Sequence, residues 1–172
     1  MRRLRWSAAL VSLAAAAAAG ATPMQDGLKL KAQGKYAQAA EAFESALEEN
    51  PKDVDALQQL ATVQGWQEQF DAAVKTWKKA LALAPKNQEL RLGLARVLYW
   101  KHEFPASLKE LAGVLAKQPR SVEALTLRGD VLLAQGDAAQ ARKAYLAARA
   151  LSPDDPDLEK KLGRTVKTPS GQ

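Results

Sequence analysis

The feature that most constrains how this chain can fold is a period of 34 residues, visible in its prolines. One set of four follows at that constant spacing: Pro51, Pro85, Pro119 and Pro153. Two residues after each stands a residue type that favours the N-cap of a helix, namely Asp53, Asn87, Ser121 and Asp155. Proline cannot continue a preceding helix, so each unit is predicted to begin a new one. Such a fixed period indicates an array of stacked units.

Other residues also recur every 34 positions, and each such set of four equivalent positions, called a column here, holds one kind of residue. Two columns are small or apolar: Ala39, Ala73, Ser107 and Ala141, then Ala46, Ala80, Val114 and Ala148. A third column is bulky and a fourth is small: Phe43, Trp77, Leu111 and Tyr145, then Gly27, Ala61, Ala95 and Gly129. A fifth is aromatic except for its last member: Tyr36, Phe70, Phe104 and Ala138. Small residues let two helices approach closely, and a large side chain fills the space beside them.

Within each unit, apolar residues recur at helical spacing in two stretches separated by a short polar break. The breaks fall at residues 33–35, 67–69, 101–103 and 135–137. Two of them contain a glycine suited to a helix end, and Pro105 suits the first turn of a following helix. Each unit is therefore predicted to be an antiparallel helix pair.

These columns resemble the tetratricopeptide repeat (TPR) family, over the range from Gly20 to Asp155. The resemblance implies an all-α, right-handed α-solenoid of about four helix pairs with a C-terminal capping helix. The predicted division is residues 1–21 as a signal peptide, 22–155 as four repeats (about 22–53, 54–87, 88–121 and 122–155), 156–166 as the capping helix and 167–172 as a disordered tail. Unit three departs most from the family pattern, with Ser107, Leu111 and Val114 where Ala, an aromatic and Ala are favoured.

The N-terminus is typical of a secretory signal peptide. Arg2, Arg3 and Arg5 precede an apolar run over residues 8–19, and small residues follow it. Cleavage after Ala19 or after Ala21 suits the small-x-small rule. An uncleaved anchor is the alternative, but the run is shorter than the roughly 20 residues that span a bilayer. We therefore expect a periplasmic protein.

The net charge and the counts of cysteine and histidine exclude several classes of function. The full chain has 25 basic and 19 acidic residues, a net charge of +6, and loss of the three signal arginines leaves 22 against 19, or +3. An exported chain with this balance is not expected to bind nucleic acid. It has no cysteine and one histidine, His102, placed in a predicted turn. No catalytic constellation, metal site or cofactor motif follows from these residues, so we expect a non-enzymatic protein without cofactors.

The predicted capping helix covers the last repeat, with Leu158 and Leu162 as its buried contacts. A basic cluster lies on and just after it: Lys160, Lys161, Arg164 and Lys167. This cluster is interpreted either as the solvated face of the cap or as a docking site for acidic partners.

The resemblance further implies a binding surface, since the first helix of each pair lines a concave groove in this family. The family's groove positions carried over to this sequence are Gln58, Thr62, Trp66, Leu92, Arg96, Tyr99, Trp100, Thr126 and Asp130. Trp66 and Trp100 are one repeat apart and should lie side by side. Each indole either packs over the turn between its helices or provides an aromatic platform for a ligand.

The basic carboxylate clamp of chaperone-binding family members is absent, because its places hold residues such as Met24, Leu28, Gln59 and Glu123. Residues 92–107 are instead similar to TPR modules of Gram-negative envelope proteins, including some beside barrels in polysaccharide export. We therefore predict a scaffold that binds a protein or peptide segment, with Trp66, Arg96, Tyr99 and Trp100 as anchors. The alternative is a carbohydrate-binding accessory of envelope polysaccharide export or assembly, using the same aromatic side chains.

Overall fold

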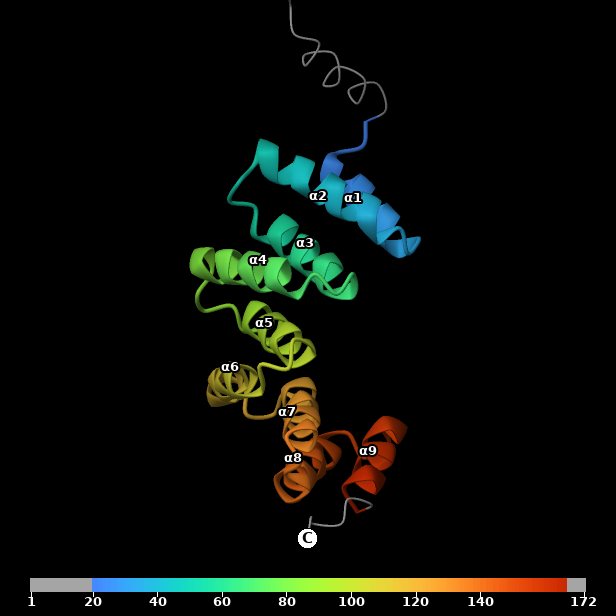
Figure 1. Ribbon diagram of the computed structural model, residues 1–172, viewed down its shortest axis with the longest axis vertical. Helices are drawn as coiled ribbons and strands as arrows, with labels where there is room; N and C mark the ends of the chain where they lie inside the picture. The colour runs from blue at the N-terminus through green and yellow to red at the C-terminus, as the bar shows by residue number, and fades with distance from the viewer. Residues whose placement is uncertain (1–19, 167–172) are drawn as a thin grey trace, which may run out of the picture.

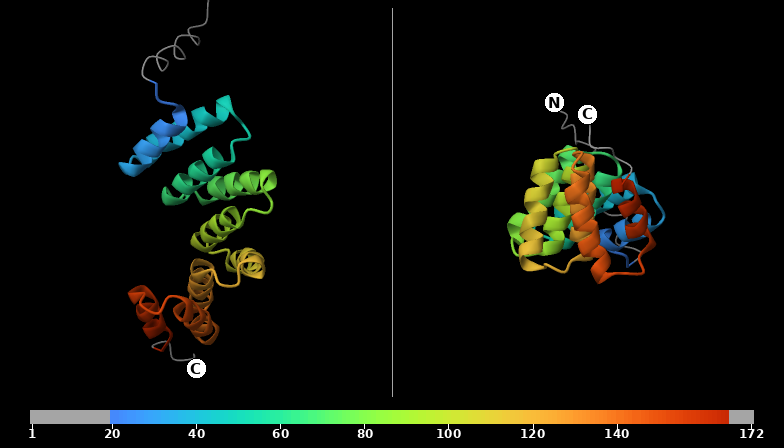
Figure 2. Two further views of the ribbon diagram at one scale, coloured as in Figure 1. Left: turned by 180° about the vertical axis from the view of Figure 1, so that it is seen from behind. Right: turned by 90° about the horizontal axis from the view of Figure 1, so that it is seen from below.

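The computed structural model describes residues 20–166, and this part of the chain is a stack of helices without strands (Figure 1). Its nine helices are α1 (Pro23–Ala32), α2 (Tyr36–Glu49), α3 (Val54–Trp66), α4 (Phe70–Leu83), α5 (Gln88–Trp100), α6 (Phe104–Lys117), α7 (Val122–Ala134), α8 (Ala138–Leu151) and α9 (Pro156–Val166). The first eight form four antiparallel pairs along the long axis, and α9 follows α8 at the C-terminal end (Figure 2). This confirms the predicted helical-repeat solenoid. The predicted signal peptide (apart from Gly20 and Ala21) and the predicted tail lie outside the described residues.

Three of the four predicted N-caps, Asp53, Asn87 and Ser121, begin the first helices of pairs two, three and four, and the fourth, Asp155, directly precedes α9 and accepts a hydrogen bond from the backbone N–H of Asp157 at 2.9 Å. Asp53 accepts a hydrogen bond from the backbone N–H of Ala56 at 3.0 Å, and Ser121 accepts one from Ala124 at 3.2 Å. Asn87 caps α5 in the same way, and Thr22, which the 34-residue period did not single out, caps α1. Each of these side chains satisfies a backbone donor that the first helical turn leaves free, which is why the 34-residue period positions the helix starts.

The turn inside each helix pair contains one residue in the left-handed region, again every 34 residues. These residues are Gly34 (φ 72°), Glu68 (φ 61°), His102 (φ 63°) and Gly136 (φ 87°). Glycine takes this conformation without strain, whereas a side chain there clashes with its own backbone. Two of the four turns are therefore strained, and both border the site described below.

The small and bulky columns meet inside the stack. Ala39, Ala73, Ser107 and Ala141 are fully buried, as are Phe43, Leu111 and Tyr145. A Cβ built on Gly27 would lie 2.6 Å from Cδ1 of Phe43, and one on Gly129 would lie 2.8 Å from Cζ of Tyr145. These glycines are thus required by the aromatic rings packed directly on them.

Trp77 extends this packing from one repeat to the next. Its indole belongs to a buried cluster with Leu57 of its own pair and Leu94 of the following pair. The ring covers Gly93 on α5, where an added Cβ would lie 2.5 Å from Cζ2. Gly93 therefore gives Trp77 room at the junction of units two and three.

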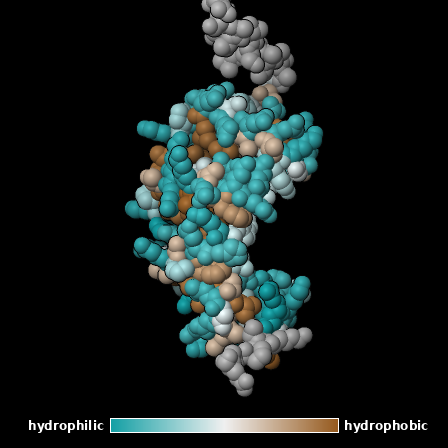
Figure 3. All heavy atoms as spheres, viewed as in Figure 1, coloured by the Kyte–Doolittle hydropathy of each residue, from teal (hydrophilic) through white to brown (hydrophobic). Residues whose placement is uncertain are grey.

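The first helices of successive pairs also contact one another, α1 with α3, α3 with α5, and α5 with α7. In the described part of the chain, no contact of this extent joins the second helices. The odd-numbered helices therefore form one face of the stack, as the predicted groove requires. The view in Figure 3 shows a largely hydrophilic surface on which apolar side chains gather in separate patches along the stack.

Candidate partner-binding groove

All nine predicted groove residues lie on the odd-numbered helices. Gln58, Thr62 and Trp66 are on α3, Leu92, Arg96, Tyr99 and Trp100 are on α5, and Thr126 and Asp130 are on α7. They differ in what they contact, so they do not form one continuous site. Three of them meet in a pocket, and the other six lie outside it.

The pocket lies where α3, α5 and α7 end, and it has a volume of about 410 Å³. Four aromatic side chains line it: Trp66, Phe70, Tyr99 and Trp100. Gly65 and Ala134 complete its apolar surface, and the two strained turn residues, Glu68 and His102, add polar groups. We name this the aromatic pocket. Three of its eight lining residues, Trp66, Tyr99 and Trp100, were predicted as groove residues, and the other five were not.

Residues one repeat apart explain why the cavity is there. Trp100 packs on Gly65, the residue at the end of the preceding first helix, where an added Cβ would lie 3.1 Å from Cζ3 of the indole. The position one repeat after Trp100 is Ala134, so no large side chain stands there to cover Tyr99 in the same way. The change from tryptophan to alanine along this column leaves the pocket open between units two and four.

Trp66 is the most exposed of the four aromatic side chains that line the pocket. Its side chain is 45% exposed and faces Tyr36 with 5.0 Å between the ring centroids. The position equivalent to Gly65 one repeat earlier is Lys31, whose ammonium lies 5.9 Å from the centroid of the Trp66 ring. A long lysine beneath the indole, in place of glycine, accounts for the greater exposure of Trp66. Trp100, by contrast, is half-buried against the core cluster that contains Trp77.

The remaining candidates on α3 and α5 have local partners. The hydroxyl of Thr62 donates to the carbonyl oxygen of Gln58 at 2.8 Å. Arg96 forms an exposed ion pair with Glu123 on α7. Leu92 is buried to 8% exposure in the core between α5 and α6, so it serves packing more than recognition. Thr126 is half-buried on α7 and does not line the aromatic pocket.

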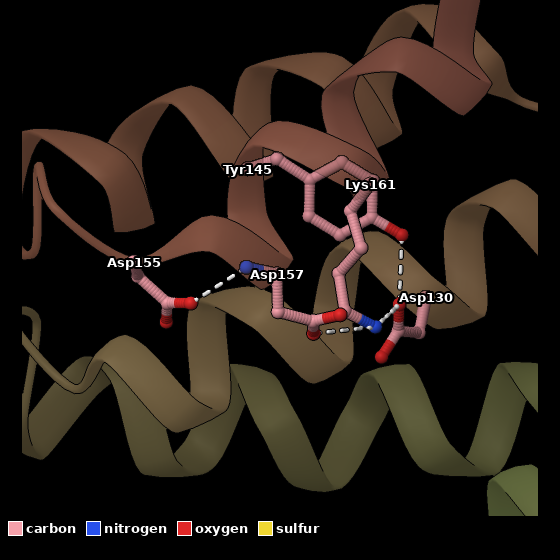
Figure 4. Close-up of polar contacts among 5 residues, drawn as sticks. All are labelled: Asp130, Tyr145, Asp155, Asp157 and Lys161. Atoms are coloured by element: carbon pink, nitrogen blue, oxygen red, sulfur yellow. Dashed lines mark hydrogen bonds and ion pairs between the residues drawn. The ribbon is translucent and has the colours of Figure 1, made fainter.

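Asp130 belongs to a polar cluster that attaches α9 to the last helix pair (Figure 4). Its carboxylate accepts a hydrogen bond from the Tyr145 hydroxyl at 2.8 Å and pairs with the Lys161 ammonium at 2.6 Å. Lys161 also lies 3.7 Å from Asp157 on α9. Burial, followed by the hydrogen bond to Asp130, raises the pKa of Tyr145 above its ordinary value. Lys161 is thus part of an internal contact and not of a freely solvated basic face.

The cap itself is apolar on one side. Leu158 and Leu162 are 1% and 5% exposed and pack in the cluster that contains Tyr145. Within residues 20–166 no helix is long and apolar enough to cross a membrane, and no group of three or more potential metal ligands occurs.

The fold defines a class of protein, that of helical-repeat solenoids. The chain belongs to the tetratricopeptide repeat family: tetratricopeptide repeat models match residues 30–76, 66–131 and 122–165. Its fold serves as a protein-interaction scaffold, and members of the family are generally not enzymes. No curated protein sequence matches the chain.

Solved structures share the fold at low sequence identity. MamA (residues 41 to the end) from Desulfovibrio magneticus RS-1 has a TM-score of 0.75 at 19% identity, over 83% of this chain and 81% of that one. TTC0263, a thermophilic TPR protein in Thermus thermophilus, has a TM-score of 0.70 at 28% identity, over 83% and 79%. Cut9 with Hcn1 of the APC/C gives 0.76 at 18% identity, but over only 29% of that chain. These likenesses support the solenoid fold and carry no partner over to this chain.

Proposed function

We propose that this chain is a non-enzymatic scaffold of the bacterial periplasm, which binds a protein or peptide segment in the groove of its odd-numbered helices. The observation that supports this most is the aromatic pocket, in which Trp66, Tyr99 and Trp100 meet across two repeats. Tryptophan and tyrosine supply large contact areas and dominate the energetics of many protein interfaces. A volume of about 410 Å³ lies in the range of ligand pockets and suits a side chain of a bound segment.

The binding experiment uses residues 22–172 and a displayed library of random peptides. Peptides selected by the wild-type chain are synthesised, and their affinities are measured by fluorescence anisotropy. Because Trp66 is 45% exposed, Trp66→Ala should retain the helical circular dichroism spectrum. It should nevertheless weaken binding by roughly tenfold or more, as expected for a hot-spot aromatic residue.

The matched control is Leu83→Ala, because Leu83 is 40% exposed on α4 and does not line the pocket. This variant should bind the selected peptides as tightly as the wild type. Equal binding by Trp66→Ala and the wild type would refute the proposed site. Oligosaccharide fragments of envelope polysaccharides provide the competing probe: if they displace the peptides and bind more tightly, the chain is the carbohydrate-binding accessory instead.

Periplasmic location rests on the N-terminal pattern of three arginines followed by an apolar run. Its test is expression of the full chain and of residues 22–172 in a Gram-negative host, followed by fractionation and mass measurement. The full chain should enter the periplasm with a mass that corresponds to cleavage after Ala19 or Ala21. A full chain of uncleaved mass in the cytoplasmic fraction would contradict this localisation.

A further inference from the structure

We infer that the aromatic pocket binds a cationic side chain, specifically the guanidinium group of an arginine in the bound segment. This inference rests on the proposed function and adds the chemistry of the group recognised. It follows from the sign of the charge in the turns around the pocket, from the aromatic side chains that line it, and from the two side chains held in strained turns at its rim.

The turns around the pocket are acidic although the chain as a whole is basic. The segments 67–71, 101–105 and 135–139 carry four carboxylates and a single ammonium group: Glu68, Asp71, Glu103 and Asp137 against Lys101. Helix termini do not offset this charge, because each turn joins the C-terminus of one helix to the N-terminus of the next and their dipoles oppose each other. The side chains therefore decide the sign, and it is negative.

The two basic residues in and just after the last turn of α5, Arg96 and Lys101, already have carboxylate partners. Lys101 lies 2.8 Å from Asp71 and also pairs with Glu103, and these carboxylates raise the pKa of its ammonium. This trio of groups keeps a net negative charge. Arg96 pairs with Glu123 away from the pocket. Within residues 20–166 Glu68 forms no ion pair, so its carboxylate is available at the pocket wall.

The aromatic rings favour the same kind of ligand. The face of an indole attracts a cation, and a planar guanidinium also stacks on aromatic rings. Trp66 already attracts one such group, since the Lys31 ammonium lies 5.9 Å from its ring centroid. Lys31 is not among the residues that line the pocket, and its ammonium donates to the side-chain oxygen of Gln59. The Lys31 ammonium therefore does not fill the pocket, and the proposed guanidinium would enter it beside Trp66 and Trp100.

Glu68 and His102 occupy the left-handed position that Gly34 and Gly136 occupy in the outer repeats. Only the two turns that border the pocket carry a side chain there, and both side chains line the pocket. Strained backbone positions of this kind cluster at functional sites. The role we infer for Glu68 is to place a carboxylate beside the aromatic rings, where it would pair with the guanidinium.

The test uses small probes whose charges differ while their shapes are similar. N-acetyl-argininamide, its neutral analogue N-acetyl-citrullinamide and the apolar N-acetyl-leucinamide are titrated into ¹⁵N-labelled residues 22–172. The indole N–H resonances of Trp66 and Trp100 report on the pocket, and that of the buried Trp77 is the internal control. The arginine probe should shift the first two saturably and bind roughly fivefold more tightly than citrulline, as expected for an exposed cation–π contact with one ion pair.

Glu68→Gln should weaken the arginine probe roughly twofold to fivefold and leave the citrulline probe unchanged. Glu44→Gln, an exposed substitution on α2 outside the pocket, should change neither affinity. Equal binding of arginine and citrulline, tighter binding of leucine, or no shift with any probe would each overturn the inference. Peptide binding that depends on Trp66 could survive all three outcomes, so failure of the arginine site is distinguishable from failure of the proposed function.

Discussion

Replacement of Gly93 by alanine tests whether one aromatic residue really joins units two and three. Gly93 lies inside α5, and an added Cβ would stand 2.5 Å from Cζ2 and 2.7 Å from Cζ3 of Trp77. Carbon atoms in contact normally lie about 3.5–4.0 Å apart, so the indole would have to move by roughly 1 Å. Trp77 is only 6% exposed and is packed among Leu57, Leu94 and other core residues, which leave it little space.

Two opposing effects set the expected magnitude. Overpacking of a filled core costs about 1–3 kcal/mol, whereas glycine to alanine in a helix interior stabilises by about 0.8–1.0 kcal/mol. The large overlap with a rigid ring places the cost in the upper part of its range. We therefore expect Gly93→Ala to lower the free energy of unfolding by about 1–2 kcal/mol.

The assay is urea unfolding followed by circular dichroism on residues 22–172. Gly163→Ala is the matched control, because Gly163 lies in α9 with no atom within 4 Å of an added Cβ. It should keep the helical gain alone and stabilise by up to about 1 kcal/mol. Trp77→Leu should be less costly in the Gly93→Ala background than in the wild type, with a coupling of about 1–3 kcal/mol. The packing argument would be refuted if Gly93→Ala were as stable as Gly163→Ala, or if the substitutions at Gly93 and Trp77 showed no coupling.

Three further predictions concern the turns and the cap. Gly136→Ala should lower the free energy of unfolding by about 1 kcal/mol, because the φ of 87° strains any side chain, although no neighbouring atom lies within 4 Å of an added Cβ. His102→Gly should raise the free energy of unfolding slightly, and thermal unfolding measures both variants. A destabilised His102→Gly would contradict the strain assigned to that turn. Asp130→Ala removes the acceptor shared by Tyr145 and Lys161, so it should cost about 1–2 kcal/mol and speed hydrogen exchange in α9, whereas Glu159→Ala, at an exposed pair, should cost far less. The raised pKa of Tyr145 means that the folded state holds this proton more tightly than the unfolded state does, so stability is complete below pH 10 and falls as the pH rises above it. Tyr145→Phe should show a smaller decline in alkaline urea titrations, and identical slopes for both proteins would exclude this linkage.

The sequence alone predicted part of the candidate site. The family's groove positions, transferred to this sequence, include Trp66, Tyr99 and Trp100, and the structure brings these three residues into one pocket. The predicted groove residues did not include Phe70, because its 34-residue column of mostly aromatic residues indicates only core packing. They also did not include Glu68 and His102, because both lie in predicted turns. The signal that could have identified Glu68 and His102 is their spacing: they lie 34 residues apart, at the turn position that is glycine in the first and last repeats. Its meaning depends on knowing that those side chains face the same cavity.

The two tryptophans show why exposure could not be predicted from the period. Both occupy one column, but Trp100 rests on Gly65 and Trp66 has Lys31 at the corresponding place. Thus one indole is half-buried and the other 45% exposed. The difference comes from the neighbouring repeat, which a column of equivalent residues does not record.

The sequence by itself determined the four helix pairs, their N-caps and the small and bulky core columns. It could do so because helix starts and pair packing depend on residues close together in the chain, and these recur every 34 positions. Only the tertiary structure decided that Gly93 accommodates Trp77, that Asp130 holds Lys161 of the cap, and that Ala134 leaves the aromatic pocket open. Those features arise between repeats, where the size of a side chain in one unit determines the space available to a different position in the next.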